Sequence, residues 1–247
     1  MSKWVEGHVV CKRCWTDELF SLQVDAPVEP FRAGQFTKLA LDIDGERVGR
    51  PYSFVNSPHE TPLEFYFITV PHGPLTERLK LLEPGDTLWL APRAAGFFTL
   101  DEVGDGEILW LLSTGTALGV FLSLLRTPEP WRRFPKIVLV HAARTVAELT
   151  YREEIQSLAD RHPGRFQYVP FVSREEYEPA LRGRIPQAIE DGRLESRVGM
   201  RIDVSDSQVM ICGNPAMVRD TIAILETRGL KKNRRTQPGQ ITTESYW

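Results

Sequence analysis

The fold is decided most clearly by one stretch of the chain, Ile108-Leu109-Trp110-Leu111-Leu112-Ser113-Thr114-Gly115-Thr116-Ala117-Leu118-Gly119. Its first five residues are continuously apolar, which is typical of a strand buried on both faces of a parallel sheet. Small residues follow, and residues 120–125 then form an apolar, helix-like stretch. The stretch therefore predicts a strand that turns directly into a helix, as in an α/β domain.

The same alternation continues toward the C-terminal end. Apolar runs predict strands at residues 137–140, 166–172 and 208–212, and helical patterns fall at residues 146–160 and 215–228. Buried strands that alternate with helices indicate a doubly wound parallel sheet. Ligands bind beyond the carboxyl ends of the strands in such sheets, so the residues that follow each strand are candidates for a site.

The first hundred residues have a different pattern. Short strands are predicted at residues 19–24, 35–41, 63–70 and 87–90, separated by turn signals such as Asp44-Gly45. Close spacing of short strands favours an antiparallel barrel, with one short helix at residues 74–82. We therefore expect two domains, an antiparallel β-barrel over residues 1–100 and a doubly wound α/β domain over residues 101–247.

Composition limits the classes of function. The chain has 247 residues, 42% of them hydrophobic, and a formal net charge of -3, which disfavours general binding to nucleic acid. No apolar stretch approaches the ~20 residues that span a membrane. The N-terminal residues lack the apolar core of a signal peptide. We expect a cytoplasmic protein whose partners are neither nucleic acid nor a membrane.

Three cysteines are too few for a disulfide framework. Cys11 and Cys14 form a C-x-x-C pair, which is compatible with a redox dithiol or with half of a zinc site. The remaining zinc ligands are missing, and residues three apart on a strand point to opposite faces. We interpret the pair as a chance feature of a strand and expect no metal.

Arg50-Pro51-Tyr52-Ser53 is the first motif that suggests chemistry. Arginine suits a phosphate through its fork of donors, and a tyrosine ring offers a flat surface for stacking. A flat ligand that carries a phosphate would use both, with a hydrogen bond from Ser53. The alternative is a strand end with an exposed arginine and a half-buried tyrosine.

Two further features lie after predicted strands. The small residues of 113–119 would present free backbone N–H groups at a helix start, which favours an anion, although a tightly packed turn explains them equally well. Arg144, Arg174 and Arg184 each follow a predicted strand or turn, and together would suit a ribose 2′-phosphate. The alternative for these arginines is solvated loop charge.

The last two features lie near the C-terminus. Cys212-Gly213-Asn214-Pro215 follows a predicted strand, where Gly213 permits close backbone approach and Pro215 suits a first helical turn. Cys212 would lie at the carboxyl end of that strand, or else act as a small buried hydrophobe. The terminal Tyr246-Trp247 predicts either ring stacking on a ligand or a hydrophobic anchor.

In this order, the motifs resemble those of the bacterial ferredoxin (flavodoxin)–NADP reductases, close to their short enterobacterial type. No single piece is specific, but the ordered set is, and it spans residues 50–247. The matching pieces are Arg50-x-Tyr52-Ser53, Thr114-Gly115-Thr116, His141-Ala142-Ala143-Arg144, Val172-Ser173-Arg174, Gly183-Arg184-Ile185-Pro186, Cys212-Gly213-Asn214-Pro215 and Tyr246-Trp247.

The resemblance implies that the barrel binds FAD. Arg50 would bind the pyrophosphate, Tyr52 would stack on one face of the isoalloxazine, and Ser53 would hydrogen-bond near the flavin N5. Tyr246 would cover the other face and Trp247 would stack on the adenine, so that the C-terminal tail returns to the FAD. The remaining FAD contacts implied are Pro51, Tyr66, Phe67, Ile68, Thr69, Pro74, Leu75 and Thr76.

The resemblance also implies that the α/β domain binds NADP(H). Arg144, Ser173, Arg174 and Arg184 would hold the adenosine 2′-phosphate, and Thr116 would lie between flavin and nicotinamide. Ala143 and Asn214 would be further contacts. The catalytic residues implied are Tyr52, Ser53, Cys212, Glu244 and Tyr246.

The activity that follows is reversible hydride transfer between NADP(H) and FAD, with one-electron exchange with ferredoxin or flavodoxin. Because these carriers are acidic, the basic run Lys231-Lys232-Asn233-Arg234-Arg235 would steer docking, unless it is only a solvated face. We expect a monomer. Two alternatives stay open: an NADH-dependent flavin or oxygenase reductase of the same superfamily, and a flavin-binding module without turnover. The arginine set argues against NADH.

Overall fold

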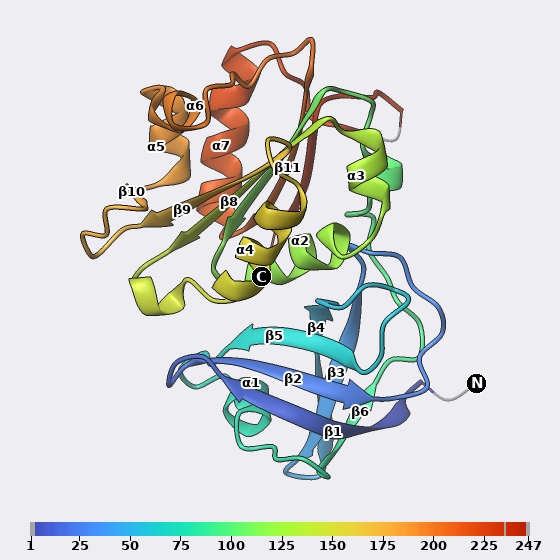
Figure 1. Ribbon diagram of the computed structural model, residues 1–247. Coiled ribbons are helices and arrows are strands. Elements are labelled where there is room, and N and C mark those ends of the chain that lie inside the picture. The colour runs from blue at the N-terminus through green and yellow to red at the C-terminus, as the bar shows by residue number, and fades with distance from the viewer. Residues whose placement is uncertain (1–2, 235, 246–247) are drawn as a thin grey trace. The chain divides into compact units, whose positions relative to one another are not determined.

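A computed structural model describes residues 3–234 and 236–245 and divides the chain into two compact units (Figure 1). The first unit comprises Met1–Thr99 together with Gly119–Thr127, and the second comprises Leu100–Leu118 and Pro128–Trp247. Helix α2 (Leu118–Leu125) therefore packs mainly with the first unit, although it follows a strand of the second. None of the helices in the described ranges is long and apolar enough to cross a membrane.

The first unit is an antiparallel barrel. Its six-stranded sheet has the order β4-β3-β6-β1-β2-β5. A bridge between Phe54 and Phe65 joins the two edge strands, and the N–H of Val55 donates to the carbonyl of Glu64 over 2.8 Å. The strands are β1 (Val5–Cys14), β2 (Leu19–Asp25), β3 (Phe36–Ile43), β4 (Glu46–Ser53), β5 (Leu63–Ile68) and β6 (Thr87–Leu90).

Turn chemistry fixes the hairpin that carries the first motif. Asp44 and Gly45 both have positive φ, 50° and 85°, which is the backbone that a two-residue hairpin turn requires. Ile43 consequently pairs with Glu46, and the register continues to Ser53 opposite Phe36. The predicted helix begins at Pro74 as expected, but α1 (Pro74–Leu79) is shorter than predicted, because residues 81 and 82 continue only as turns.

The second unit is a parallel six-stranded sheet with the order β10-β9-β8-β7-β11-β12. Its strands are β7 (Ile108–Thr114), β8 (Lys136–Ala143), β9 (Phe166–Val172), β10 (Leu181–Arg182), β11 (Ser207–Gly213) and β12 (Ile241–Ser245). The helices are α3 (Glu129–Arg133), α4 (Arg152–Arg161), α5 (Ile185–Glu190), α6 (Arg193–Val198) and α7 (Pro215–Thr227). Short 3-10 turns occur at η1 (Leu100–Glu102), η2 (Gly115–Ala117) and η3 (Val146–Glu148). The predicted fold class, a barrel followed by a doubly wound parallel sheet, is confirmed.

One face of this sheet packs against α5, α6 and α7. Trp110, Val140 and Ile211 contribute to a single buried cluster that also contains apolar residues of these three helices. Side chains alternate along a strand, so Leu111, Ser113 and His141 lie on the opposite face. The continuous apolar runs of the sequence are explained because both faces are buried.

The expected helix over residues 146–160 is wrong as a continuous element. The chain forms η3, then breaks, and α4 begins at Arg152 after Tyr151 adopts a left-handed φ of 54°. Leu149, Thr150 and Tyr151 are all buried. Three consecutive residues cannot all lie on the buried face of one helix, and the break allows each to be buried.

Candidate active site

In the first unit, β4 places the Arg50-Pro51-Tyr52-Ser53 motif at the end of a paired strand. The Tyr52 ring lies 6.1 Å from the Phe67 ring at an interplanar angle of 78°. Burial raises the pKa of the Tyr52 phenol above its usual value, and the nearby Arg50 charge opposes this only in part. Tyr52 is therefore a neutral flat ring at physiological pH. Arg50 and Pro51 are exposed, and an Arg50 nitrogen donates to the carbonyl of Gly49 over 2.9 Å.

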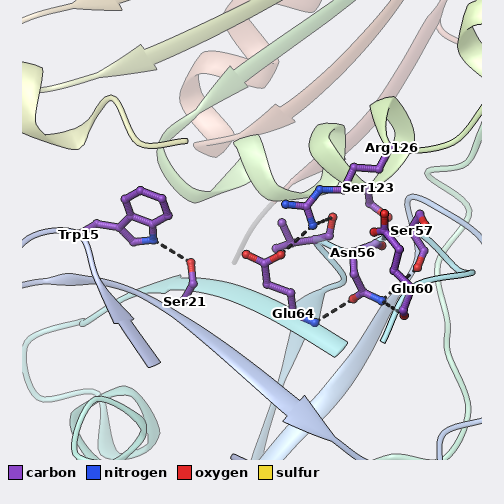
Figure 2. A network of polar contacts seen from close by, with 9 residues as sticks. Trp15, Ser21, Asn56, Ser57, Glu60, Glu64, Ser123 and Arg126 are labelled. Carbon is purple, nitrogen blue, oxygen red and sulfur yellow. Dashed lines mark hydrogen bonds and ion pairs between the residues drawn. The ribbon is translucent and has the colours of Figure 1, made fainter. Parts of the chain in front are cut away.

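Strand β5 directs its residues to two faces. Phe67 stacks on Phe20 in the barrel core, so its side chain is not available to a ligand. Tyr66 faces the other way, where its ring meets Trp15 edge-on at 6.5 Å. The indole of Trp15 is itself held by a 2.7 Å hydrogen bond to Ser21 (Figure 2). Ile68 is half-buried at the end of the strand.

Thr69 follows β5 and carries an unsatisfied group. Its hydroxyl oxygen is buried and has no hydrogen-bond partner among the residues that the structure describes. Leaving such a group unpaired costs about 1–3 kcal/mol. A polar ligand at the end of β5 would satisfy it, which fits the FAD contact that the resemblance implies for Thr69.

Helix α1 begins with Pro74 at its first turn, and the turn before it is tightly built. The Thr76 hydroxyl accepts from the N–H of Val70 over 3.0 Å. A Cβ atom at Gly73 would lie only 2.8 Å from that hydroxyl, so glycine permits this approach. Leu75 points into the core, which leaves Pro74 and Thr76 as the more accessible of the expected contacts.

Helix α2 is fastened to the outer face of β5 by a buried polar network (Figure 2). Arg126 forms a 2.7 Å ion pair with Glu64 and donates to the carbonyl of Val55 over 3.1 Å. Ser123 donates to the carbonyl of Asn56 over 2.8 Å. At the other end of α2, an added Cβ at Gly119 would meet Val55 and Tyr66 at 3.0 and 3.6 Å. The helix therefore backs the strand that carries Tyr66.

In the second unit, a row of side chains crosses the carboxyl edge of the sheet. Cys212 pairs with Ser113 on one side and with Glu244 on the other, and Ser113 pairs with His141. Residues at one level of neighbouring parallel strands share a face. Cys212, Ser113 and His141 are fully buried. The predicted position of Cys212 at a strand end is therefore observed.

Glu244 has the most altered environment of this row. It is half-buried on β12, a strand that the sequence pattern did not predict. Its Oε2 atom is buried and has no partner in the described ranges, and burial raises the pKa of Glu244 to about 7. A carboxyl group with this pKa gains and loses a proton near neutral pH, as acid–base chemistry requires.

The turns that follow β7 and β11 in the second unit are joined by a hydrogen bond. The N–H of Asn214 donates to the Thr114 hydroxyl over 2.9 Å, and the Asn214 side chain accepts from the N–H groups of Ala216 and Met217 at the start of α7. Gly213 has a φ of 137°, and a Cβ atom there would lie 2.1 Å from the Thr114 hydroxyl. Only glycine fits between the turns. Thr116 is buried in η2 beside them.

Backbone hydrogen bonds hold the chain segments that carry the predicted arginines next to one another. The N–H of Arg174 donates to the carbonyl of Arg144 over 2.9 Å, and the N–H of Ser173 donates to that of Ala143 over 3.2 Å. The N–H of Gly183 donates to the carbonyl of Val172 at the end of β9. Arg184 is the next residue, is exposed and directly precedes α5, so it lies beside the end of β9. Parallel strand ends thus bring these side chains to one edge.

Glu148 is a residue of this edge that the sequence analysis missed. Its carboxylate pairs with Arg144 at 2.7 Å and also accepts from the backbone N–H of Arg144 over 2.9 Å. The helical spacing rule could not have found this pair, because Arg144 lies between β8 and η3 and shares no helix with Glu148. Glu148 holds Arg144 in one orientation at the sheet edge.

The remaining expected residues fall into two groups: three lie outside the described residues, and two cysteines are exposed on β1. Tyr246, Trp247 and Arg235 lie outside the described residues. Cys11 and Cys14 are exposed on β1, opposite Gln23 and Phe20. Within residues 3–234 and 236–245, no group of three or more His, Cys, Asp or Glu side chains could hold a metal ion.

An antiparallel barrel followed by a parallel sheet with polar turns and arginines at its carboxyl edge is typical of two-domain, nucleotide-dependent oxidoreductases. Residues 111–222 match the family described as the oxidoreductase NAD-binding domain. The chain is 53% identical over 248 residues to a flavodoxin/ferredoxin–NADP reductase of Escherichia coli, with 100% of both chains covered. It is 35% identical to a ferredoxin–NADP reductase of Pseudomonas aeruginosa, over 99% of this chain and 98% of that one.

The structural comparison agrees. A ferredoxin NADP+ reductase from Neisseria gonorrhoeae, solved with bound FAD and NADP, superimposes with a TM-score of 0.94 and 29% identity over 100% of both chains. The chain belongs to the flavodoxin/ferredoxin–NADP reductase family.

Proposed function

We propose that this chain is an FAD-containing reductase that moves electrons between NADP(H) and ferredoxin or flavodoxin. The observation that carries the proposal is the arginine edge of the second unit, where Arg144, Ser173 and Arg174 are brought together by backbone hydrogen bonds. An enzyme that used NADH would have no need of a cationic edge for a 2′-phosphate. Full-length identity of 53% to reductases of this kind supports the same reading.

The first unit fits FAD. Exposed Arg50 would bind the pyrophosphate, and neutral Tyr52 would lie against the isoalloxazine with Ser53 next to it. The unpaired Thr69 hydroxyl would hydrogen-bond to the ribityl chain. Bound FAD would supply hydride chemistry toward the nicotinamide and one-electron chemistry toward the carrier. The residues of the barrel bind, orient and exclude water.

The second unit fits NADP(H). The arginine edge would hold the 2′-phosphate, and the interlocked turns at Thr114 and Asn214 would hold the pyrophosphate and nicotinamide end. Glu244 would hold or release a proton at its carboxyl group near neutral pH, with Cys212 next to it in the register of the sheet. Tyr246 and Trp247 remain expectations from the resemblance.

The carrier would be recognised by charge. Lys231, Lys232 and Arg234 are exposed on a segment that is fixed at its base, where Asn233 donates to the carbonyl of Glu102 over 2.6 Å and accepts from the N–H of Gly239. Such a fixed cationic segment would steer an acidic ferredoxin or flavodoxin. A cytoplasmic location and a monomeric state are part of the proposal, and sedimentation analysis of the holoenzyme checks the second.

The test is carrier-dependent electron transfer. The holoenzyme is given NADPH and cytochrome c, with and without added flavodoxin or ferredoxin. Carrier-dependent reduction of cytochrome c is expected, at a rate that falls as salt is added. Reduction of free flavin with no stimulation by either carrier would favour a flavin reductase instead, and no turnover at all would favour a binding module.

A further inference from the structure

The arginine edge of the second unit contains an acidic side chain to which the proposed function gives no role. Glu148 is the last residue of η3 and lies four residues after Arg144. Its side chain is only 15% exposed, whereas the Arg144 side chain is 42% exposed. A carboxylate in this position needs an explanation, because its negative charge repels a phosphate that binds nearby.

The contact between the two residues has three hydrogen bonds. The Oε1 atom of Glu148 accepts from both Nε and Nη2 of Arg144, over 2.8 and 2.7 Å. The Oε2 atom accepts from the backbone N–H of Arg144 over 2.9 Å. The carboxylate therefore holds Arg144 at its backbone and at its guanidinium. Two neighbouring N–H groups of a planar fork are engaged, so the plane of the guanidinium and the direction of its other donors are fixed.

The turn that carries Glu148 is itself anchored to the sheet. The N–H of Val146, at the start of η3, donates to the Glu175 carboxylate over 3.0 Å. Leu149, the residue after Glu148, is buried in a small cluster with the last residues of β8 and β9. The position of the Glu148 carboxylate is therefore set by the strand ends, and Arg144 is oriented relative to them.

We propose that Glu148 is a positioning residue that raises the affinity for the 2′-phosphate of NADP(H) by acting through Arg144. A long exposed arginine loses rotamer freedom when it binds a ligand, and the ion pair with Glu148 removes most of that freedom beforehand. This gain outweighs the repulsion between the carboxylate and the phosphate. The inference rests on the proposed function, because it takes Arg144 as a ligand of the 2′-phosphate.

The experiment uses a ligand that carries the phosphate and needs no turnover. 2′-Phospho-AMP is titrated by calorimetry into the FAD-loaded holoenzyme, for wild type and for Glu148→Gln. The amide of Gln has one oxygen, so it can accept from the guanidinium or from the backbone N–H of Arg144 but not from both as the carboxylate does. Glu148→Gln is expected to weaken binding of 2′-phospho-AMP about three- to tenfold, the effect of one hydrogen bond.

Steady-state kinetics with a dye as electron acceptor separate the 2′-phosphate from the rest of the coenzyme. In Glu148→Gln, kcat/KM for NADPH is expected to fall by about the same factor, through a higher KM at unchanged kcat. For NADH, kcat/KM is expected to change less than about twofold, because NADH lacks the 2′-phosphate. A merely structural role of Glu148 would lower both values.

Glu175→Gln is the matched control. It removes the same charge from the same edge, but the Glu175 carboxylate accepts from the N–H of Val146, and Gln keeps an oxygen for that bond. If an acid at this edge only repels the phosphate, both substitutions tighten the binding of 2′-phospho-AMP. Positioning predicts weaker binding in Glu148→Gln and unchanged or tighter binding in Glu175→Gln.

A double-mutant cycle shows whether Glu148 acts through Arg144. Arg144→Met alone is expected to weaken binding of 2′-phospho-AMP at least about tenfold, and Glu148→Gln is expected to add no further weakening in that background. Arg144→Lys keeps the charge but not the planar fork, so it is expected to lose affinity although Glu148 is intact. This last variant carries the test if Glu148→Gln does not fold.

Unchanged or tighter binding of 2′-phospho-AMP in Glu148→Gln would overturn the inference, as would equal effects of Glu148→Gln and Glu175→Gln. Full affinity in Arg144→Lys would also overturn it. If the wild-type holoenzyme does not bind 2′-phospho-AMP and oxidises NADH as well as NADPH, the proposed function fails. If the wild type binds 2′-phospho-AMP and prefers NADPH, and Glu148→Gln behaves in the same way, only the inference about Glu148 fails.

Discussion

Glu64 and Arg126 form a 2.7 Å ion pair in the first unit, although 62 residues separate them in the sequence. Both side chains are largely buried, and Arg126 also donates to the carbonyl of Val55. The pair explains why the segment Gly119–Thr127 belongs to the barrel unit, even though the preceding strand belongs to the other sheet. Along the sequence, the chain therefore passes from the second unit into the first at Gly119 and back into the second at Pro128.

Removing one partner of this pair leaves a buried charge without compensation. Arg126→Met is expected to lower the free energy of unfolding of the first unit by about 3 kcal/mol. Urea unfolding followed by fluorescence measures the change. Arg93→Gln is the matched control in the same unit, since its pair with Glu29 is exposed and worth less than about 1 kcal/mol. Similar losses in the two variants would show that the pair does not fasten α2.

Gly213→Ala tests the contact between the two turns of the second unit. Gly213 has a φ of 137°, and the Cβ atom of an alanine there would lie 2.1 Å from the Thr114 hydroxyl. The substitution would therefore force the two turns apart. We expect a lower melting temperature and at least tenfold weaker NADP+ binding. Gly192→Ala is the control, because Gly192 also has a positive φ, 79°, but nothing lies within 4 Å of its added Cβ. The idea is refuted if the two alanines behave alike.

Glu244→Gln tests the environment of the buried carboxyl. The pKa of Glu244 is raised to about 7 by burial, so the folded protein holds this proton more tightly than the unfolded chain does. Wild-type stability should therefore decline as pH rises from about 4.5 through 7, and this part of the decline should be absent in Glu244→Gln. Melting curves at pH 5, 6, 7 and 8 measure both. Parallel curves for wild type and variant would contradict the assignment.

Charge reversal on the basic segment tests carrier docking. Lys231→Glu with Lys232→Glu is expected to lower the association rate with flavodoxin and to flatten its dependence on salt, while NADPH oxidation with a small dye is unchanged. Stopped-flow measurements at several ionic strengths give both quantities. Arg161→Glu, on α4, is the control for net charge. If the two variants lower the rate equally, this segment has no special part in docking.

Much of the fold could be predicted because burial on both faces of a parallel sheet leaves continuous apolar runs. β9 (Phe166–Val172) has the bounds that its apolar run predicted, and β7, β8 and β11 extend their predicted cores by a few residues. The break before α4 could not be predicted, because the apolar pattern of residues 146–160 does not reveal that three neighbouring residues are all buried.

The candidate site was only partly predictable. Arginines that follow parallel strands must meet at one edge, so the gathering of Arg144 and Arg174 follows from topology. The positions of Glu148, His141 and Arg126 depend on side-chain partners that only the folded chain brings together. β12 is short and polar on one side, so its sequence carries no strong strand signal, and the environment of Glu244 could not be foreseen.

The most direct test of the proposed reductase is anaerobic mixing of the holoenzyme with NADPH and, separately, NADH, with flavin bleaching followed by stopped-flow absorbance. NADPH is expected to bleach the flavin far faster than NADH at equal concentration. Arg174→Gln should remove about tenfold or more of that preference, since one charge-assisted hydrogen bond to the phosphate is lost. A wild-type holoenzyme that NADH reduces as fast as NADPH would contradict the assignment of the arginine edge to the 2′-phosphate.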